Sequence, residues 1–241
     1  HSGYMHRDPL HRNTKGAHYQ SDQKPKFEVV ESAGGLFIAA RRNAEEGHYY
    51  WRITQWIMPW YTMVPPYGDN ALNAHAWVPI DDENCFTWTF TYHPTRPLSD
   101  LELNVMKRGG GIHVQLIPGT FRPIMNKDND YGMDRLAQKR GETYCGVRGI
   151  AMQDASLQES MGAVQDRTRE NLCPTDRGIV MMRRLLKQSA EANRAGKPLP
   201  GLNPEEQHVR SCSLLLPKEQ AFKDHARHGL FPPLGTDPIT V

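Results

Sequence analysis

The chain has 241 residues, and its 29 lysines and arginines nearly balance its 27 aspartates and glutamates, for a formal net charge of +2. Proteins that act on nucleic acids or anionic membranes carry a larger basic excess, so this charge argues against both kinds of partner. The sequence has no apolar run of the roughly eighteen residues that a membrane-spanning helix needs. Its four cysteines are widely separated, without a Cys-x-x-Cys pair, which favours free thiols in a reducing, cytoplasmic compartment over a disulfide framework or a zinc site.

The first 25 residues are polar and rich in histidine, and they show no apolar periodicity. Pro9 and Gly16 are typical of a loop, so we expect residues 1–25 to form one. The chain opens His-Ser-Gly, without an initiator methionine or an apolar leader. We therefore expect this loop to lead from an upstream region of a longer protein, and residues 26–241 to form one domain.

The first half of that domain has the composition of an antiparallel sheet. Strands are predicted for five runs rich in β-branched and aromatic residues: 26–31, 35–40, 49–58, 73–80 and 84–92. The segments 32–35 and 81–84 between neighbouring runs are typical of hairpin loops. Because short connections join these strands, we expect them to pair antiparallel.

The second half changes to helical patterns. A long amphipathic helix is predicted over 175–195, because apolar residues recur every three or four positions and Gly196 with Pro198 ends it. Its apolar stripe, expected to pack on the sheet, consists of Ile179, Met182, Leu185 and Leu186. Its outward-facing basic residues are expected to be Arg183, Arg184 and Lys187. The other predicted elements are helices that begin near Leu98 (with Ser99 as cap) and cover 131–139, 151–161 and 217–228, a loop over 107–130, and a strand over 212–216.

A sheet followed by one long amphipathic helix predicts an α+β fold. We expect the helix-grip (START-like) form of this class, in which the antiparallel sheet curves around the long C-terminal helix. Such an arrangement leaves a cavity between sheet and helix that holds a small molecule.

Eleven histidines invite a search for a metal site. His1, His6 and His11 are five residues apart, and His18 follows. Five residues correspond to about 140° around a helix axis, which is a poor chelating geometry, and in a loop the spacing fixes no geometry. The residues alone leave two interpretations: a solvated histidine-rich loop, which the composition favours, or a set of metal ligands.

The aromatic strand predicted over 49–58 contains an arginine. Arg52 lies on the same face as Tyr50 and Trp56, because side chains alternate along a strand. A guanidinium in an aromatic-walled cavity binds a carboxylate bidentately. The alternative is an arginine that stacks on a ring and points to solvent. Both remain open, and Arg52 and Trp56 are the candidate substrate-binding residues.

The helix predicted over 151–161 carries Asp154. On the residues alone, Asp154 is an ordinary carboxylate in the first turn of a helix, where the helix dipole favours it. Its context is more specific. The block is Gln153-Asp154-Ala-Ser-Leu-Gln-Glu159-Ser-Met-Gly162, followed by Asp166-Arg-Thr-Arg-Glu-Asn-Leu172 and Thr175-Asp-Arg177.

This block resembles the C-terminal catalytic domain of Rieske-type aromatic ring-hydroxylating oxygenases, and most closely the phthalate 4,5-dioxygenase-like branch. The segments 49–56, 58–63 and 179–186 are similar to the same branch, and the resemblance covers roughly residues 20–230. It implies a mononuclear non-heme Fe(II) centre held by two histidines and one carboxylate, with positions left open for dioxygen beside the substrate.

The resemblance also implies which residues hold the iron. Asp154 matches the carboxylate ligand of the family. The family's histidines stand in an Asp-x-x-His-x4-His run, and the opening His-Ser-Gly of this chain resembles the end of that run. His1 is therefore the candidate second histidine ligand, and the first lies upstream of the chain. The pairs His1 with His6 and His6 with His11 have the same spacing but lack the preceding acidic residue.

The partners implied by the resemblance extend beyond this chain. Terminal oxygenases of this family, dioxygenases or monooxygenases, use O2 and electrons that pass from NAD(P)H through a reductase or ferredoxin component to a Rieske [2Fe–2S] cluster. The Cys-x-His and Cys-x-x-His ligands of that cluster are absent from this chain, so we expect residues 26–241 to be the non-heme iron catalytic domain of a longer α subunit. In this family the cluster that serves each iron belongs to a neighbouring subunit, which implies a homotrimer or a stack of two trimers. The expected substrate is an aromatic carboxylate bound by Arg52.

A function of a different class is a non-catalytic helix-grip domain that carries a small aromatic or lipid molecule. This alternative predicts no bound iron and a cavity without converging histidine and aspartate side chains. Metal analysis of the full-length protein distinguishes the two.

Overall fold

The computed structural model describes residues 22, 24–66, 70–224 and 230. The chain divides into two compact units, and each is described by itself. Within the described residues, the first unit consists of 79–85 and 97–169, and the second unit of the remainder. The loop expected over residues 1–25 lies almost entirely outside the described residues.

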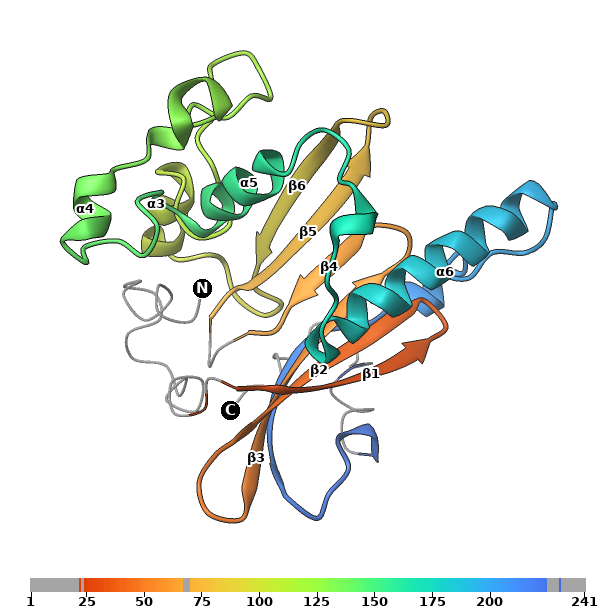
Figure 1. Ribbon diagram of the computed structural model, residues 1–241. Helices are drawn as coiled ribbons and strands as arrows, with labels where there is room; N and C mark the ends of the chain where they lie inside the picture. The colour runs from red at the N-terminus through yellow and green to blue at the C-terminus, as the bar shows by residue number, and fades with distance from the viewer. Residues whose placement is uncertain (1–21, 23, 67–69, 225–229, 231–241) are drawn as a thin grey trace. The chain divides into compact units, whose positions relative to one another are not determined.

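Seven strands of the described residues form one sheet, in which β1 to β6 follow one another in order and β7 joins β3 (Figure 1). The strands are β1 (Lys26–Ser32), β2 (Gly35–Asn43), β3 (His48–Ile57), β4 (Tyr61–Val64), β5 (Leu72–Pro79), β6 (Cys85–Tyr92) and β7 (Cys212–Pro217). β7 and β4 share one edge of β3, with β7 beside His48–Ile53 and β4 beside Gln55–Ile57. All the predicted strands form, and β4 is an additional strand. The antiparallel sheet and its helices confirm the predicted α+β class.

Alternate residues of β3 serve two apolar clusters on opposite faces of the sheet. Trp51 and Ile53 belong to one cluster, with Leu214 and Leu216 of β7 and with Phe222 beyond its end. Trp56 belongs to the other, with Leu36 of β2. The side-chain period of two in a strand therefore explains why β3 is buried along most of its length: it is covered on both sides.

Helix α6 (Arg177–Arg194) confirms the predicted long amphipathic helix, and it covers the second cluster over β1 and β2 (Figure 1). Its residues in contact with the cluster are Met181, Met182, Leu185 and Leu186. The prediction for Ile179 is wrong, because this side chain is 40% exposed. Gly178 instead approaches the sheet, where an added Cβ would lie 3.1 Å from Cδ1 of Ile38. The cavity expected between the sheet and the long helix stays a prediction.

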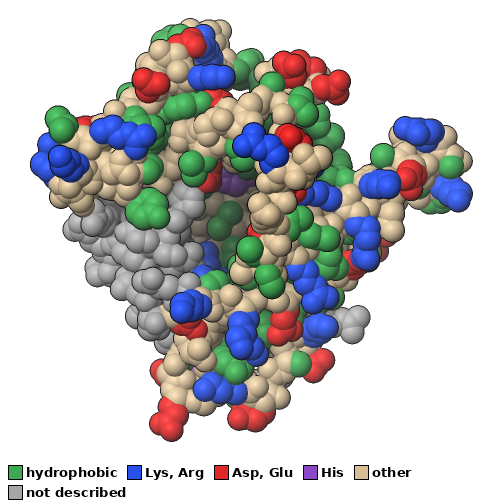
Figure 2. Space-filling view, viewed as in Figure 1, with side chains coloured by type: hydrophobic (Ala, Val, Ile, Leu, Met, Phe, Trp, Pro, Cys, Tyr) green, Lys and Arg blue, Asp and Glu red, His purple; other side chains and the backbone are tan. Residues whose placement is uncertain are grey.

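The polar side of α6 is basic, and Figure 2 shows Lys and Arg side chains gathered along it. Lys187 is 79% exposed at its side chain, as expected. Arg184 reaches back to Glu31 of β1 and forms an ion pair with it. Arg183 is less exposed than predicted, because both of its terminal nitrogens bond the carboxylate of Glu170, at 2.5 and 2.8 Å. Arg183 and Arg184 thus attach the helix to Glu170 and Glu31 through ion pairs, whereas Lys187 faces solvent.

The described part of the first unit is built from short helices and turns. They are α3 (Asp100–Lys107), the 3-10 turns η2 (Lys127–Gly132) and η3 (Arg167–Arg169), α4 (Arg135–Lys139) and α5 (Ile150–Ser160); η4 (Pro174–Asp176) and η5 (Pro204–Gln207) belong to the second unit. Ser99 caps α3, as predicted, in a reciprocal pair with Glu102. Among the described residues, no helix combines the length and the apolar character that crossing a membrane would require.

Two predicted helices differ from the structure. The helix predicted over 131–139 is confined to α4, because Tyr131 has a positive φ of 56° and belongs to η2. In the helix predicted over 217–228, residues 218–220 form a turn, residues 222–224 are helical, and residues 225–228 lie outside the described residues. In both cases a turn occupies the first part of the predicted helix.

Candidate active site

β3 places Arg52 and Trp56 on one face of the sheet, as the alternation predicts. Arg52 lies opposite Ala40 of β2 and Ser213 of β7, and Trp56 lies opposite Leu36. Both side chains are buried, with exposed fractions of 6% and 5%. Trp56 packs in the apolar cluster beneath α6, so its ring is part of the core that holds this helix.

The buried guanidinium of Arg52 is held by backbone. Three successive carbonyl groups, those of residues 64–66, each accept a hydrogen bond from a side chain on this face. The three bonds are Ser211 Oγ to Val64 O (2.9 Å), Arg52 Nη2 to Pro65 O (2.9 Å) and Ser213 Oγ to Pro66 O (2.8 Å). We call residues 64–66 the carbonyl strap. A substrate carboxylate as a further partner of Arg52 stays a prediction.

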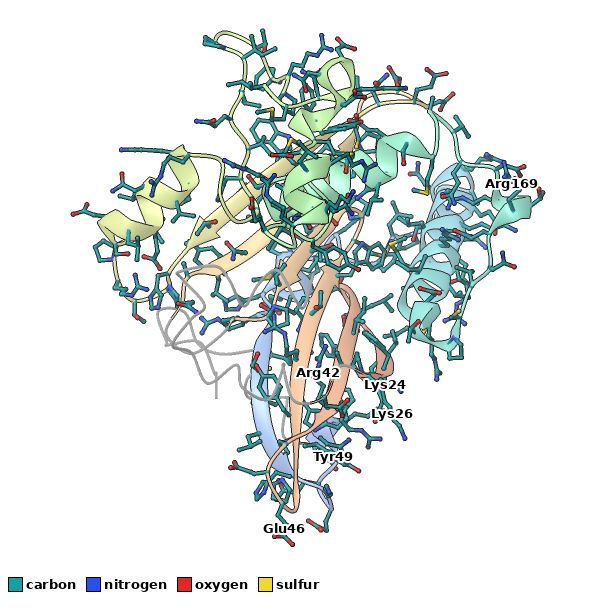
Figure 3. The ribbon with its side chains drawn as sticks, turned by 60° about the vertical axis from the view of Figure 1, so that its left-hand side comes forward. Lys24, Lys26, Arg42, Glu46, Tyr49 and Arg169 are labelled. Atoms are coloured by element: carbon teal, nitrogen blue, oxygen red, sulfur yellow. The ribbon has the colours of Figure 1, made fainter. Side chains whose placement is uncertain are left out.

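The opposite face of β3 shows the ring stacking that was the alternative for Arg52. The guanidinium carbon of Arg41 lies 4.3 Å from the ring centroid of Tyr49, and Nζ of Lys218 lies 5.5 Å from it. Tyr49 lies near the start of β3, beside the hairpin that carries Glu46 at its tip (Figure 3). Arg41 thus stacks on the Tyr49 ring, whereas Arg52 is a buried hydrogen-bond donor to the carbonyl strap.

Asp154 lies on α5, as predicted, in the first unit. The helix begins after Gly149, whose φ of 81° favours glycine. Gln153 is 4% exposed, and its Nε2 donates to the carbonyl oxygen of Val147 at 3.1 Å. Asp154 follows at the border of this buried side and is half-buried. The first turn of α5 contains no acidic residue, so the helix dipole does not account for Asp154.

The last turn of α5 is tied to the turn η2. The hydroxyl of Tyr131 donates to a carboxylate oxygen of Glu159. The Tyr131 ring is 9% exposed and packs against Val147 and Met152. Burial, together with the Glu159 carboxylate, raises the pKa of Tyr131 to about 12. The phenol therefore keeps its proton, and remains a hydrogen-bond donor, across the physiological pH range.

The family of the chain follows from a match over most of its length. Residues 11–229 match the family described as LigXa C-terminal domain like. The chain belongs to this family. The match includes β3, α5 and α6, so it covers Arg52, Trp56 and Asp154 together.

Two relatives agree with this assignment. The chain is 32% identical, over 90% of its length, to the 3-chlorobenzoate-3,4-dioxygenase oxygenase subunit of Comamonas testosteroni. It is 28% identical, over 85% of its length, to the phthalate 4,5-dioxygenase oxygenase subunit of Pseudomonas putida. These matches confirm the resemblance to the catalytic domain of Rieske-type ring-hydroxylating oxygenases. They include 54% and 47% of the two relatives, so the chain spans about half of their length.

Of the iron ligands expected for this family, Asp154 alone lies among the described residues. Within the ranges that the structure describes, no group of three or more His, Cys, Asp or Glu side chains lies close enough to hold a metal ion. Asp154 stands in the first unit, Arg52 and Trp56 in the second, and His1 outside the described residues. The ligand role of Asp154 and of His1 stays a prediction.

Sequence reasoning missed Tyr131. Glu159 is part of the quoted block, but its partner lies 28 residues earlier, in a segment expected to begin a helix. The composition of residues 126–132 contains the one available signal: Asn, Asp and Gly residues are typical of tight turns. That signal predicts the turn, but it does not predict which side chain the turn directs into the core.

Proposed function

We propose that this chain is the catalytic portion of a terminal oxygenase that hydroxylates an aromatic substrate with O2 at a mononuclear non-heme Fe(II). The observation that carries the proposal is Asp154: a half-buried carboxylate at the family's ligand position, on a helix whose dipole does not explain it. The family match and the two relatives named as dioxygenase oxygenase subunits support this reading.

The donor set fits one face of an iron ion in part. Asp154 would supply the carboxylate of a two-histidine, one-carboxylate set, and His1 and a histidine upstream of the chain would supply the imidazoles. A half-buried carboxylate suits this role, because it stays ordered by the packing of its helix and still reaches outward. When bound, the Fe(II) supplies open coordination positions for dioxygen beside the substrate.

For the substrate, we propose an aromatic carboxylate. The two relatives are named for 3-chlorobenzoate and phthalate, and both molecules combine an aromatic ring with a carboxylate. Arg52 is the proposed anion-binding residue, because its planar guanidinium matches carboxylate geometry and its bond to the carbonyl strap fixes its orientation. Trp56 would hold β3 in place against α6 beside the substrate site.

Electrons would reach the iron from NAD(P)H through a reductase or ferredoxin component and a Rieske [2Fe–2S] cluster. That cluster would belong to the part of the full-length α subunit outside residues 26–241. A homotrimer, or a stack of two trimers, would bring the cluster of one subunit to the iron of its neighbour. The name "oxygenase subunit" of both relatives supports a component that works within a larger system.

Metal analysis of the full-length protein tests the proposal. Asp154→Ala should lose the mononuclear iron and the NAD(P)H-dependent hydroxylation of benzoate or phthalate but keep the iron of the Rieske cluster, and its far-UV circular dichroism should match the parent's. Asp166→Ala is the matched control, because Asp166 is an exposed carboxylate of the same unit that bonds the Thr168 hydroxyl. This control should retain iron and turnover.

Two results would overturn the proposal. Mononuclear iron that persists in Asp154→Ala, beyond the iron of the Rieske cluster, would remove Asp154 from the ligand set. The parent protein could instead bind an aromatic acid tightly but hold no mononuclear iron and show no O2-dependent activity. That result would identify the non-catalytic binding domain.

A further inference from the structure

We propose that the hydrogen bond between Tyr131 and Glu159 positions helix α5, and through it the carboxylate of Asp154. Tyr131 and Glu159 are thus positioning residues that do not themselves touch the reacting atoms. The inference rests on the proposed ligand role of Asp154. Its basis is a strained turn, the burial of one ring and the place of Asp154 between two anchors.

The turn η2 holds Tyr131 in a costly backbone conformation. Asp130, Tyr131 and Gly132 have consecutive positive φ values of 49°, 56° and 59°. Glycine adopts such values freely, but a residue with a side chain pays on the order of 1 kcal/mol or more. Two neighbouring residues with side chains share this conformation here, so the surrounding structure must enforce it.

A network around Asn126 enforces the turn. The Asn126 side chain accepts from the backbone N–H of Asp128 at 3.0 Å, and its backbone N–H donates to Oδ1 of Asn129 at 2.9 Å. The carbonyl of Asn126 accepts from the N–H of Tyr131 at 2.9 Å. Nδ2 of Asn129 donates to the carbonyl of Ile124 at 2.7 Å. The turn is therefore fixed before any contact with α5 is counted.

The strained backbone sets the direction of the Tyr131 side chain. It turns the ring of Tyr131 into the cluster of Val147 and Met152, where the ring is 9% exposed. From there the hydroxyl reaches Glu159, one of the exposed residues of the last turn of α5. Among the hydrogen bonds of the described residues, this one alone links that last turn to another element.

Asp154 lies between two points at which α5 is anchored. Gln153 fixes the helix through the carbonyl of Val147, and Glu159 fixes it through Tyr131. A side chain ends about 5–6 Å from a helix axis, so a rotation of about 15° displaces it by about 1.4 Å. Metal–ligand distances tolerate only about 0.2 Å. The Gln153 bond holds α5 at one point, and the Tyr131–Glu159 bond adds a second point that resists tilting of the helix about the first.

Iron affinity of the full-length protein tests the inference. Fe(II) dissociation constants would be measured by competition with a chromogenic chelator, at a temperature where every variant shows the circular dichroism of the parent. Tyr131→Phe keeps the ring but removes the donor, and Glu159→Ala removes the acceptor. Each should weaken Fe(II) binding roughly tenfold, as loss of a supporting hydrogen bond near a metal site does. The double variant should lose no more than either single variant, because both remove the same bond.

Two further variants separate positioning from a general loss of stability. Glu159→Gln retains an acceptor oxygen and should keep most of the parent's affinity. Ser160→Ala is the matched control, because the Ser160 hydroxyl bonds only the carbonyl of Leu157 within α5; its affinity should equal the parent's.

The outcomes distinguish this inference from the function on which it rests. If Asp154→Ala loses the mononuclear iron and Tyr131→Phe binds that iron as tightly as the parent, the positioning role is wrong and the oxygenase proposal stands. If Asp154→Ala retains the mononuclear iron, both are wrong. A roughly tenfold loss in both Tyr131→Phe and Glu159→Ala, with Glu159→Gln near the parent, supports the positioning role.

Discussion

Nη2 of Arg52 donates to the carbonyl oxygen of Pro65 across 2.9 Å, inside the protein. The bond lies between those of Ser211 and Ser213 to the flanking carbonyls, so a charged side chain and two hydroxyls together hold the carbonyl strap. All three donors are buried. Arg52 therefore stabilises the fold whatever else it binds, because it donates a hydrogen bond to the buried carbonyl of Pro65, which needs a partner inside the protein.

The first prediction concerns the stability that Arg52 provides. Arg52→Gln should lower the free energy of unfolding by about 1–3 kcal/mol, the usual cost of leaving a buried polar group without its partner. Urea denaturation of this chain measures the loss. Arg194→Gln, at the exposed C-terminal end of α6, is the control and should change stability by less than about 0.5 kcal/mol. Equal stability of the two variants would contradict the structural role.

A second measurement on the same residue concerns the substrate. Arg52→Lys keeps the charge but loses the planar fork. In the full-length enzyme it should raise KM for an aromatic acid, and leave KM for a neutral ring of similar size nearly unchanged. A variant that is less stable but has the parent's KM for both substrates would show that Arg52 serves the strap alone.

The sequence predicts those elements whose pattern is local. The strand at Tyr49–Trp56 and the helix bearing Leu185 and Leu186 follow from composition and periodicity, and both form. β4 was missed because its four residues directly follow an aromatic run and are too short to show alternation. Ile179 has the right spacing but is exposed, since Gly178 brings the helix close to the sheet at that turn. The periodicity gives the apolar stripe but not where the contact ends.

The candidate site was predictable to a different degree. The helical pattern of residues 151–161 placed Asp154 on a helix, and alternation placed Arg52 and Trp56 on one face, and both placements hold. The partners of these residues were not predictable. The carbonyl of Pro65 meets Arg52, and the phenol of Tyr131 meets Glu159 on the helix of Asp154, only through the path of the chain in three dimensions, which no spacing along the sequence encodes.

The contact between α6 and the sheet gives the next prediction. Leu186 packs on the cluster of Trp56 and Leu36, whereas Ile179 on the same helix is 40% exposed. Leu186→Ala should therefore cost about 2 kcal/mol, at the lower end of the range for a buried leucine because its burial is partial. Ile179→Ala should cost less than about 1 kcal/mol. Thermal and urea denaturation compare the two variants, and the reverse order would contradict the packing of α6.

The cysteines should differ sharply in reactivity. Cys85 and Cys173 are exposed, Cys145 is half-buried, and Cys212 is buried in the sheet. Burial raises the pKa of the Cys212 thiol to about 12, so at pH 8 about one molecule in 10,000 carries the reactive thiolate there. A disulfide reagent such as DTNB should label Cys85 and Cys173 quickly, and Cys212 only after denaturation. Rapid labelling of native Cys85→Ser/Cys173→Ser/Cys145→Ser protein would contradict this placement.

The last prediction uses the alkaline titration of Tyr131. Its pKa is raised from 10.0 to about 12 in the folded protein by burial and by Glu159, so the neutral phenol is favoured in the native state. The stability that this provides is fully present below pH 10. It is lost as the pH rises from 10 to 12, because the unfolded chain ionises its tyrosine first. Tyr131→Phe removes this contribution, so its free energy of unfolding should fall by roughly 1 kcal/mol less than the parent's between pH 9.5 and 11.5, a value reduced for solvent near the hydroxyl. Urea denaturation at the two pH values measures the difference. The control is Tyr144→Phe, since Tyr144 is 75% exposed, and this variant should follow the parent. If Tyr131→Phe also follows the parent, the Tyr131 phenol is not held neutral against Glu159.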